Sequence, residues 1–265
     1  MNDTIRTVAS STGSPQVRLS LSRLAAAEWT KLRTLRSVAV AALCAVGLGL
    51  AGGLLQLLSY GPASEIGSLN ATRALTDSMG MARAGLQIGV VVLAVLAVGS
   101  EYATGAIRTT LIAAPRRLAV MAAKAAVVAV AAALLAAIVL TIVFMAAVPL
   151  LRGVGFSAIP FGPGVAVLGT EVGYCVIVAL FAFAVTLAFR STALGVSLAL
   201  GVVLLLPIML ALLNAMLQID LTGLAFPQAV SGVMTDPVST DLPVVLAWLG
   251  VPAVFGGAAL VRRDA

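Results

Sequence analysis

The residues of this chain that are able to do chemistry are few, and their types exclude most enzymes. The sequence of 265 residues has no histidine and two cysteines, Cys44 and Cys175, both inside apolar runs. Without histidine, neither the His-Glu-x-x-His zinc motif nor a Ser-His-Asp triad can form. Two cysteines are too few for a cysteine-based zinc site. The P-loop pattern, Gly-x4-Gly-Lys followed by Ser or Thr, is also absent. We therefore expect a protein that is not an enzyme and binds no cofactor of its own.

The charged residues gather in one sizeable interruption, Glu101 to Lys124, which has long apolar runs on both sides. On a helix, Glu101 and Arg108 would share a face because they are seven positions apart. Gly105 would let another backbone approach closely, and Pro115 would end the element. The pattern predicts a cytosolic loop that contacts a soluble partner. The alternative is a set of ordinary basic residues at span ends. The interruption keeps four basic residues: Arg108, Arg116, Arg117 and Lys124.

The elements that must position these residues are membrane helices. The chain is 61% hydrophobic and 10% charged, whereas a soluble domain carries about 25% charged residues. Its apolar runs are too long for barrel strands, and about 20 apolar residues cross a bilayer as a helix. Pro149 and Pro207 are candidate kink sites. We expect an all-α integral membrane protein with six spans: Val38–Leu58, Ala84–Ser100, Ala125–Leu151, Gly164–Phe189, Thr192–Leu217 and Leu242–Val261.

The distribution of Lys and Arg predicts the orientation of these spans. Most of them lie on the side that holds the N-terminus, the 101–124 loop, Arg190 and the C-terminal tail. Because basic loops stay inside, we expect a multi-pass protein of the cell membrane with both termini in the cytosol. The net charge of +6 then reflects span ends and gives no reason to expect nucleic-acid binding. Residues 1–18 are polar and are expected to be a disordered cytosolic N-terminus.

Residues 19–36 predict an amphipathic helix in the cytosolic interface, ahead of the transmembrane domain at 37–265. Its leucine stripe would face lipid, with Trp29 and Arg33 at headgroup depth. Glu28 projects from the middle of the stripe, where an unpaired carboxylate is costly. It pairs either with Lys31, three positions on, or with a basic residue of the 101–124 loop or of a partner protein. The stripe consists of Leu21, Leu24, Leu32 and Leu35.

Glu171 is the only acidic residue that falls well inside an expected span, and Tyr174 lies one turn further on. An ionisable group at such a depth is a functional candidate. Three roles stay open for Glu171: it lines a substrate path, it pairs across a helix interface, or it relays protons.

Small residues and a Gly- and Pro-rich loop complete the pattern. Three glycine pairs have the spacing that allows helices to pack closely, and we interpret them as packing sites within the subunit. The loop at 218–241 holds either short helices that dip into the outer leaflet or a plain surface loop. The pairs are Gly49 with Gly53, Gly85 with Gly89, and Gly169 with Gly173.

The motif AEWTKLRTLRS before the first span and the pattern Glu101-x3-Gly105-x2-Arg108-x2-Leu111-x3-Pro115-x-Arg117-x6-Lys124 after the second resemble a known family. With six spans and both ends inside, they are similar to the type-two ABC exporter permeases, the drug- and lipid-export class common in high-GC Gram-positive bacteria.

The resemblance implies two permease subunits, identical or similar, and a separate ATP-binding cassette subunit, with its ATP and Mg, beneath each. Short coupling helices in the first cytosolic loop would contact that ATPase, with Arg190 as a second, smaller contact. The 218–241 loop would form re-entrant helices. The cargo, by composition lipophilic or amphipathic, would be a drug, lipid or peptide moved outward. The alternative is a non-transporting immunity or sensory component that docks a soluble partner. The coupling residues carried over from the family are Glu101, Gly105, Arg108, Pro115 and Arg117.

Overall fold

The computed structural model describes residues 21–61, 70–105, 117–156, 161–236 and 240–262, and no strand occurs among them. The expected disordered segment at 1–18 lies outside these residues. The elements follow in the order α1 (Leu21–Thr34), α2 (Arg36–Leu58), α3 (Ala71–Thr104), α5 (Arg117–Gly153), α6 (Phe161–Phe189), α7 (Thr192–Leu200), η2 (Gly201–Leu205), α8 (Leu206–Leu217), η3 (Thr222–Leu224), α9 (Phe226–Thr235) and α10 (Leu242–Arg262).

Helices of membrane-spanning length dominate the described part of the chain, as its composition predicts. Five are long and apolar enough to cross a bilayer: Arg36–Leu58, Ala71–Thr104, Leu118–Gly153, Phe161–Phe189 and Thr192–Leu217. The sixth expected span corresponds to α10, whose apolar stretch Leu242–Ala258 is shorter. The described residues therefore confirm an all-helical chain with five helices long and apolar enough to cross a membrane, as expected of a membrane protein, while the sixth span stays a prediction.

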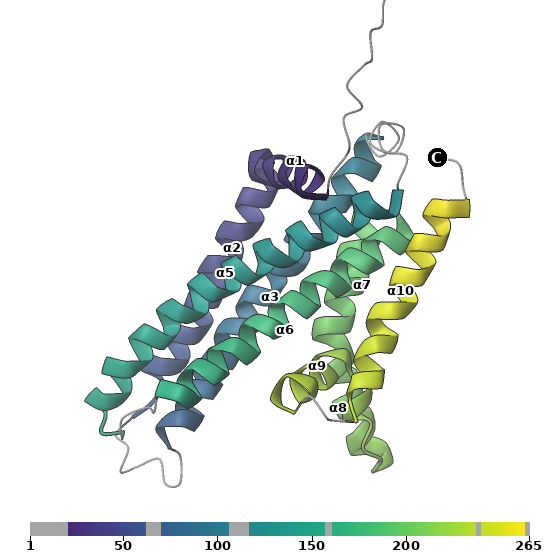
Figure 1. The fold of residues 1–265 in the computed structure, drawn as a ribbon. Helices are drawn as coiled ribbons and strands as arrows, with labels where there is room; N and C mark the ends of the chain where they lie inside the picture. The colour runs from purple at the N-terminus through teal and green to yellow at the C-terminus, as the bar shows by residue number, and fades with distance from the viewer. Residues whose placement is uncertain (1–20, 62–69, 106–116, 157–160, 237–239, 263–265) are drawn as a thin grey trace, which may run out of the picture.

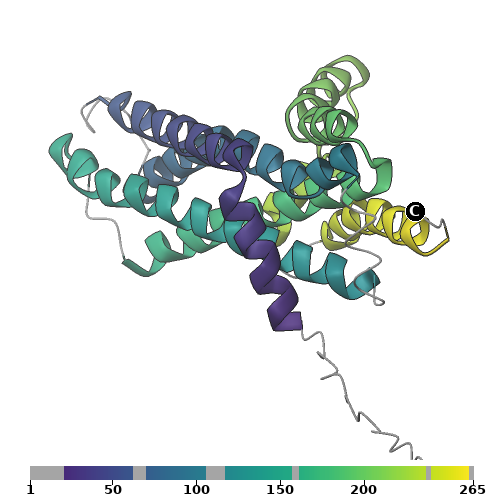
Figure 2. The same cartoon turned by 90° about the horizontal axis from the view of Figure 1, so that it is seen from above.

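The long helices form a bundle in which α3 and α6 are central. α3 packs against α2, α5, α6 and α7, and α6 packs against α3, α5, α7, α9 and α10. In Figure 1, α1 and the end of α10 lie at the same end of the bundle. Figure 2 shows that α1 crosses this end at a steep angle to the long helices. The first described helix and the end of the last described helix thus lie at the same end of the bundle.

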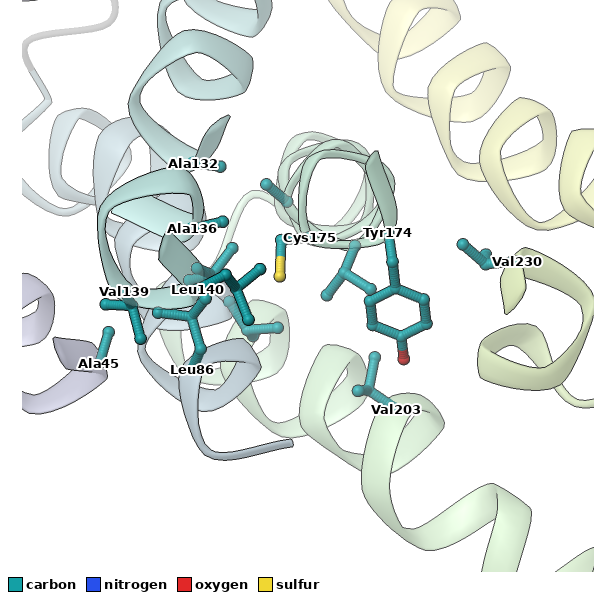
Figure 3. Packing of buried hydrophobic residues seen from close by; sticks show 14 of the residues in the cluster. Ala45, Leu86, Ala132, Ala136, Val139, Leu140, Tyr174, Cys175, Val203 and Val230 are labelled. Atoms are coloured by element: carbon teal, nitrogen blue, oxygen red, sulfur yellow. The ribbon is translucent and has the colours of Figure 1, made fainter. Parts of the chain in front are cut away.

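Small and branched apolar side chains fill the centre of the bundle. Leu86 of α3, Leu140 of α5 and Cys175 of α6 meet there, with Ala136 of α5 beside them (Figure 3). All four are fully buried. Alanine at such positions lets the helix backbones approach closely, and dispersion contacts then stabilise the bundle. Cys175 is a free thiol and takes part as a small hydrophobe.

The second span begins much earlier than its predicted start at Ala84. α3 begins after Asn70, whose side chain accepts a hydrogen bond from the Arg73 backbone N–H at 2.8 Å. Arg73 in turn pairs with Asp77 one turn further on, at 3.2 Å. This cap and this i,i+4 pair stabilise the helix in a stretch where the hydropathy is low. Arg83, which directly precedes the predicted start at Ala84, lies within the helix.

The fifth span departs from regular α-helix close to Pro207, as expected. η2 is a π-helical turn between α7 and α8, and Pro207 lies in the first turn of α8. Because proline has no N–H to donate to the preceding turn, the ladder is interrupted there. Pro149, the other candidate, lies inside α5, which continues past it to Gly153.

The 218–241 loop contains the short helices η3 and α9, and their place in the outer leaflet stays a prediction. α9 buries Phe226, Ala229 and Val230 against the bundle. η3 is tied to α10 because the indole N–H of Trp248 donates to the Leu224 carbonyl oxygen at 3.2 Å.

Two of the three glycine pairs are packing sites between α2 and α3. A Cβ at Gly85 would overlap the Leu48 carbonyl oxygen, and one at Gly89 would overlap Ala45. Gly49 and Gly53 face α3 and α5 in the same close manner. The third pair is not a packing site between these two helices. Gly169 has open space beside it, and Gly173 faces the Met234 sulfur of α9.

We expect Gly89→Leu to weaken the α2–α3 contact, because any side chain there meets the backbone and Cβ of Ala45. The cost of such overpacking is about 1–3 kcal/mol in free energy of unfolding. Unfolding in mixed micelles of increasing SDS content measures it. Gly80→Leu in the same helix is the control, since a Cβ there meets nothing within 4 Å. Equal stability of the two variants would contradict the packing role.

Candidate functional site

Helix α1 lies on the bundle with its leucine stripe inward. Leu32 is buried and packs with Val38, Leu93 and Ala131, while Leu24 packs against the main core. Trp29 is half-buried against the same small cluster. A helix occupies Leu21–Thr34 of the predicted segment 19–36, and its leucines Leu24 and Leu32 contact protein instead of the expected lipid. Arg33 is on the exposed side.

Four charged side chains from α1, α3 and α5 meet beneath this helix: Glu28, Lys31, Glu101 and Lys124. We call them the charge cluster. Lys124 is the central member, since its ammonium contacts a Glu28 carboxylate oxygen and donates to Glu101 Oε1 at 2.7 Å. Lys31 Nζ lies 2.9 Å from Glu28 Oε1 and 3.2 Å from Glu101 Oε1.

Lys124 is 2% exposed, and both carboxylates are almost as deeply buried, at 8% each. A single buried ion would be costly, but two lysines and two glutamates cancel in charge. Removing one partner leaves the others uncompensated. The cluster therefore fixes where α1 lies on α3 and α5.

The two alternatives for Glu28 are both present. Its carboxylate contacts Lys31, three positions on, and Lys124 at the far end of the 101–124 segment. Burial lowers the pKa of Lys31, but the hydrogen bond to Glu28 and the charges of Glu101 and Glu28 outweigh it and raise that pKa above 10.5. Because the pKa of Lys31 is higher in the folded state than in the unfolded state, its contribution to stability is fully present at neutral pH. That contribution is lost only as the pH rises from 10.5 through the folded-state pKa.

A cavity of about 370 Å³ adjoins the cluster. All four charged side chains line it, together with Thr34 and Ser100. Glu101 Oε2 is buried and has no hydrogen-bond partner among the described residues. Apolar residues line the cavity as well, among them Leu32, Leu35 and Val127.

The predicted coupling residues lie in different environments. Glu101 belongs to the end of α3 and turns inward to the cluster, so it does not present its carboxylate to a partner. Gly105 caps α3 with a left-handed φ of 71°, and a Cβ there would meet nothing. α3 ends at Thr104 and Gly105 is its cap, so the expectation that Glu101 and Arg108 share one helix face, like the close approach of another backbone to Gly105, stays a prediction.

Arg108 and Pro115 lie outside the described residues. Arg117 is the first residue of α5. Arg190 occupies the short turn between α6 and α7 with a φ of 53°. Ser191 follows it and caps α7 by accepting from the Leu194 N–H at 3.4 Å. Arg190 therefore lies in a short turn, and its contact with an ATPase stays a prediction.

A second polar group joins α3 to α6. Arg83 Nε lies 2.7 Å from Glu171 Oε2, and the guanidinium carbon lies 4.0 Å from the centre of the Tyr174 ring. The pairing with Glu171 is a charge contact, because Nε is not directed at the oxygen as in a hydrogen bond. The Tyr174 hydroxyl donates to Gln87 Oε1 at 3.1 Å.

This arrangement fits one of the three roles considered for Glu171, the pair across a helix interface. Tyr174 is 2% exposed, and in Figure 3 it projects from α6 toward Val203, with Val230 to one side. Its ring thus lies within the protein, beneath α9 and beside the π-helical turn.

Sequence reasoning included Lys124 only as one of the four basic residues of the 101–124 segment that could pair with Glu28, and it gave no partner to Arg83. A carboxylate inside an apolar run requires a nearby cation, and this requirement could have indicated that Glu28 and Glu171 each have a basic partner. Lys124 lies 96 positions from Glu28 along the chain, and the spacing of residues in the sequence cannot predict such a contact.

No group of three or more His, Cys, Asp and Glu side chains able to hold a metal ion occurs in the described part of the chain. Comparison with known proteins does not place the chain in a family. No protein-family model matches it, and no curated protein matches it.

We expect Lys124→Met to cost about 3–5 kcal/mol in free energy of unfolding, because it leaves two buried carboxylates with one exposed lysine. The matched control is Arg73→Met, which breaks a pair with side chains 69% and 38% exposed. Such a surface pair contributes about 0–1 kcal/mol. SDS-induced unfolding of both variants measures the difference. Equal losses would show that the charge cluster does not hold the bundle.

Proposed function

We propose that the chain is the membrane-spanning permease subunit of an ATP-driven exporter of the type-two ABC class. It lies in the cell membrane with both termini in the cytosol, and α10 is its sixth span. ATP and Mg are bound by a separate ATP-binding cassette subunit. Two permeases, identical or similar, form the pathway for a lipophilic or amphipathic drug, lipid or peptide.

The charge cluster is the observation that carries this proposal. Glu101 lies at the end of α3 and Lys124 near the start of α5, so the two helices flanking residues 106–116 are joined by an ion pair. Glu28 joins α1 to the same pair. A displacement applied at 106–116 would thus be passed to α1, α3 and α5 together. Transmission of this kind requires rigid elements in direct contact.

Within this proposal the predicted residues divide by role. Arg108, Pro115, Arg117 and Arg190 contact the ATPase, and Gly105 ends α3 before the contact segment. Glu28, Lys31 and Glu101 are positioning residues that hold α1 against α3 and α5. Trp29 and Arg33 place α1 at headgroup depth. Glu171 and Tyr174 support the α3–α6 interface.

The exposed surface of the fifth span supports the pairing of permeases. Of the five candidate spans, Thr192–Leu217 has the smallest buried share. None of the residues of α8 is buried in the single chain. A second permease and lipid would cover this surface.

Purification of the tagged protein from its native membranes tests the proposal. A P-loop ATPase should copurify in comparable amount, and its ATP hydrolysis should rise in the complex. Arg117→Glu and Arg108→Glu should reduce both complex formation and hydrolysis, because they reverse charge at the proposed contact. Arg73→Glu is the control, since Arg73 lies in the first turn of α3, far from that contact.

A complex without a P-loop protein would contradict the exporter and favour the non-transporting alternative. Intact hydrolysis in both arginine variants would contradict the assignment of the contact.

A further inference from the structure

Helix α2 has a packing face and an outer face of different composition. It lies at the edge of the bundle (Figure 2) and packs against α3 and α5. Arg36, its first residue, is exposed and belongs to the outer face, because at 100° per residue it falls about 180° from the buried Ala45. The packing face consists of Val38, Ala41, Ala45, Gly49, Gly53 and Leu57.

Apolar residues follow Arg36 along the outer face. Val40, one turn on, is 59% exposed, and Leu43, two turns on, is 71% exposed. Gly47 continues the face and has open space beside it. Spacings of four, seven and eleven positions from Arg36 keep these residues on one side of the helix. The outer face is therefore an apolar track about 16 Å long that begins at an arginine.

A second arginine lies close to the first. Arg33 is exposed near the end of α1, and Leu35 joins the two helices with extended backbone, at a ψ of 112°. Three residues span at most about 11 Å, so one phosphate group is within reach of both long arginine side chains. Neither arginine has an ion pair with a described residue. Glu28, the one acidic residue of α1, is turned inward to the charge cluster.

The order of charge and apolar surface distinguishes between possible occupants of the outer face. An acidic protein surface would neutralise the arginines but would not match the apolar track. A second copy packed on the same face would bring like arginines together, because a two-fold contact places equivalent residues opposite each other. A phospholipid has an anionic head and apolar chains in the matching order. Two arginines without an acidic partner favour a headgroup with net negative charge.

We propose that the outer face of α2 binds an anionic phospholipid. Its phosphate lies at Arg33 and Arg36, and one acyl chain lies along Val40, Leu43 and Gly47. The length of the track matches the roughly 15 Å hydrocarbon depth of one leaflet. The inference requires only that α2 crosses a bilayer, and neither transport nor an ATPase is assumed.

An indole at position 43 reports which lipid contacts this face. Leu43→Trp is made in a Trp29→Phe, Trp248→Phe background, which removes both native tryptophans of the full-length chain. The protein is reconstituted in phosphatidylcholine vesicles that contain increasing fractions of brominated phosphatidylglycerol or brominated phosphatidylcholine. Bromine in the acyl chains quenches indole fluorescence on contact. We expect half-maximal quenching at a lower fraction of phosphatidylglycerol, by about five-fold for each arginine.

The charge at position 36 should control this preference. Arg36→Gln should reduce it about five-fold, whereas Arg36→Lys retains the charge and should keep it. Arg73→Gln is the distant control, since it removes an exposed charge at the start of α3, and it should also leave the preference unchanged.

Equal quenching by the two lipids, or a preference that Arg36→Gln leaves intact, would overturn the proposal. Protection of the indole from both lipids would also overturn it, since another protein surface would then cover the outer face of α2.

Discussion

The burial of Lys124 between two carboxylates is the constraint on which the arrangement of this protein depends. Lys124 is 2% exposed in α5, a helix long and apolar enough to cross a membrane, and its ammonium contacts Glu28 of α1 and Glu101 of α3. An ammonium at such a site is tolerated only when its charge is balanced nearby. Because the balancing groups come from two other helices, the position of α1 follows from the electrostatics of α5.

This constraint explains why α1 is part of the bundle and not a separate interfacial anchor. Its leucines cover α2, α3 and α5, and its one inward carboxylate completes the charge cluster. Apolar contact alone would allow a short helix to slide on its support. Charge pairs with defined partners fix its register, so α1 and the ends of α3 and α5 form one rigid unit. A partner acting on residues 106–116 would act on that unit.

Much of the fold could be predicted from apolar runs, because a helix of about 20 apolar residues leaves an unmistakable pattern. The start of α3 could not, since Arg73, Asp77 and Arg83 interrupt the hydropathy while local pairs and a cap keep the helix intact. The periodicity of its leucines predicts which face of α1 is apolar, but not whether that face contacts protein or lipid. The pairs of Glu28 with Lys124 and of Arg83 with Glu171 join segments that are far apart in the sequence. The spacing of neighbouring residues therefore cannot predict these pairs.

The most direct test of this account is the distance between α1 and α5 measured by pulsed electron resonance on spin labels at Thr30→Cys and Ala122→Cys. Both positions are exposed, and Cys44→Ala and Cys175→Ala remove the native thiols. The account predicts one narrow distance distribution that broadens when Lys124→Met is added and is unchanged by Arg73→Met. A distribution that stays narrow in Lys124→Met would contradict the claim that this buried lysine holds α1 in place.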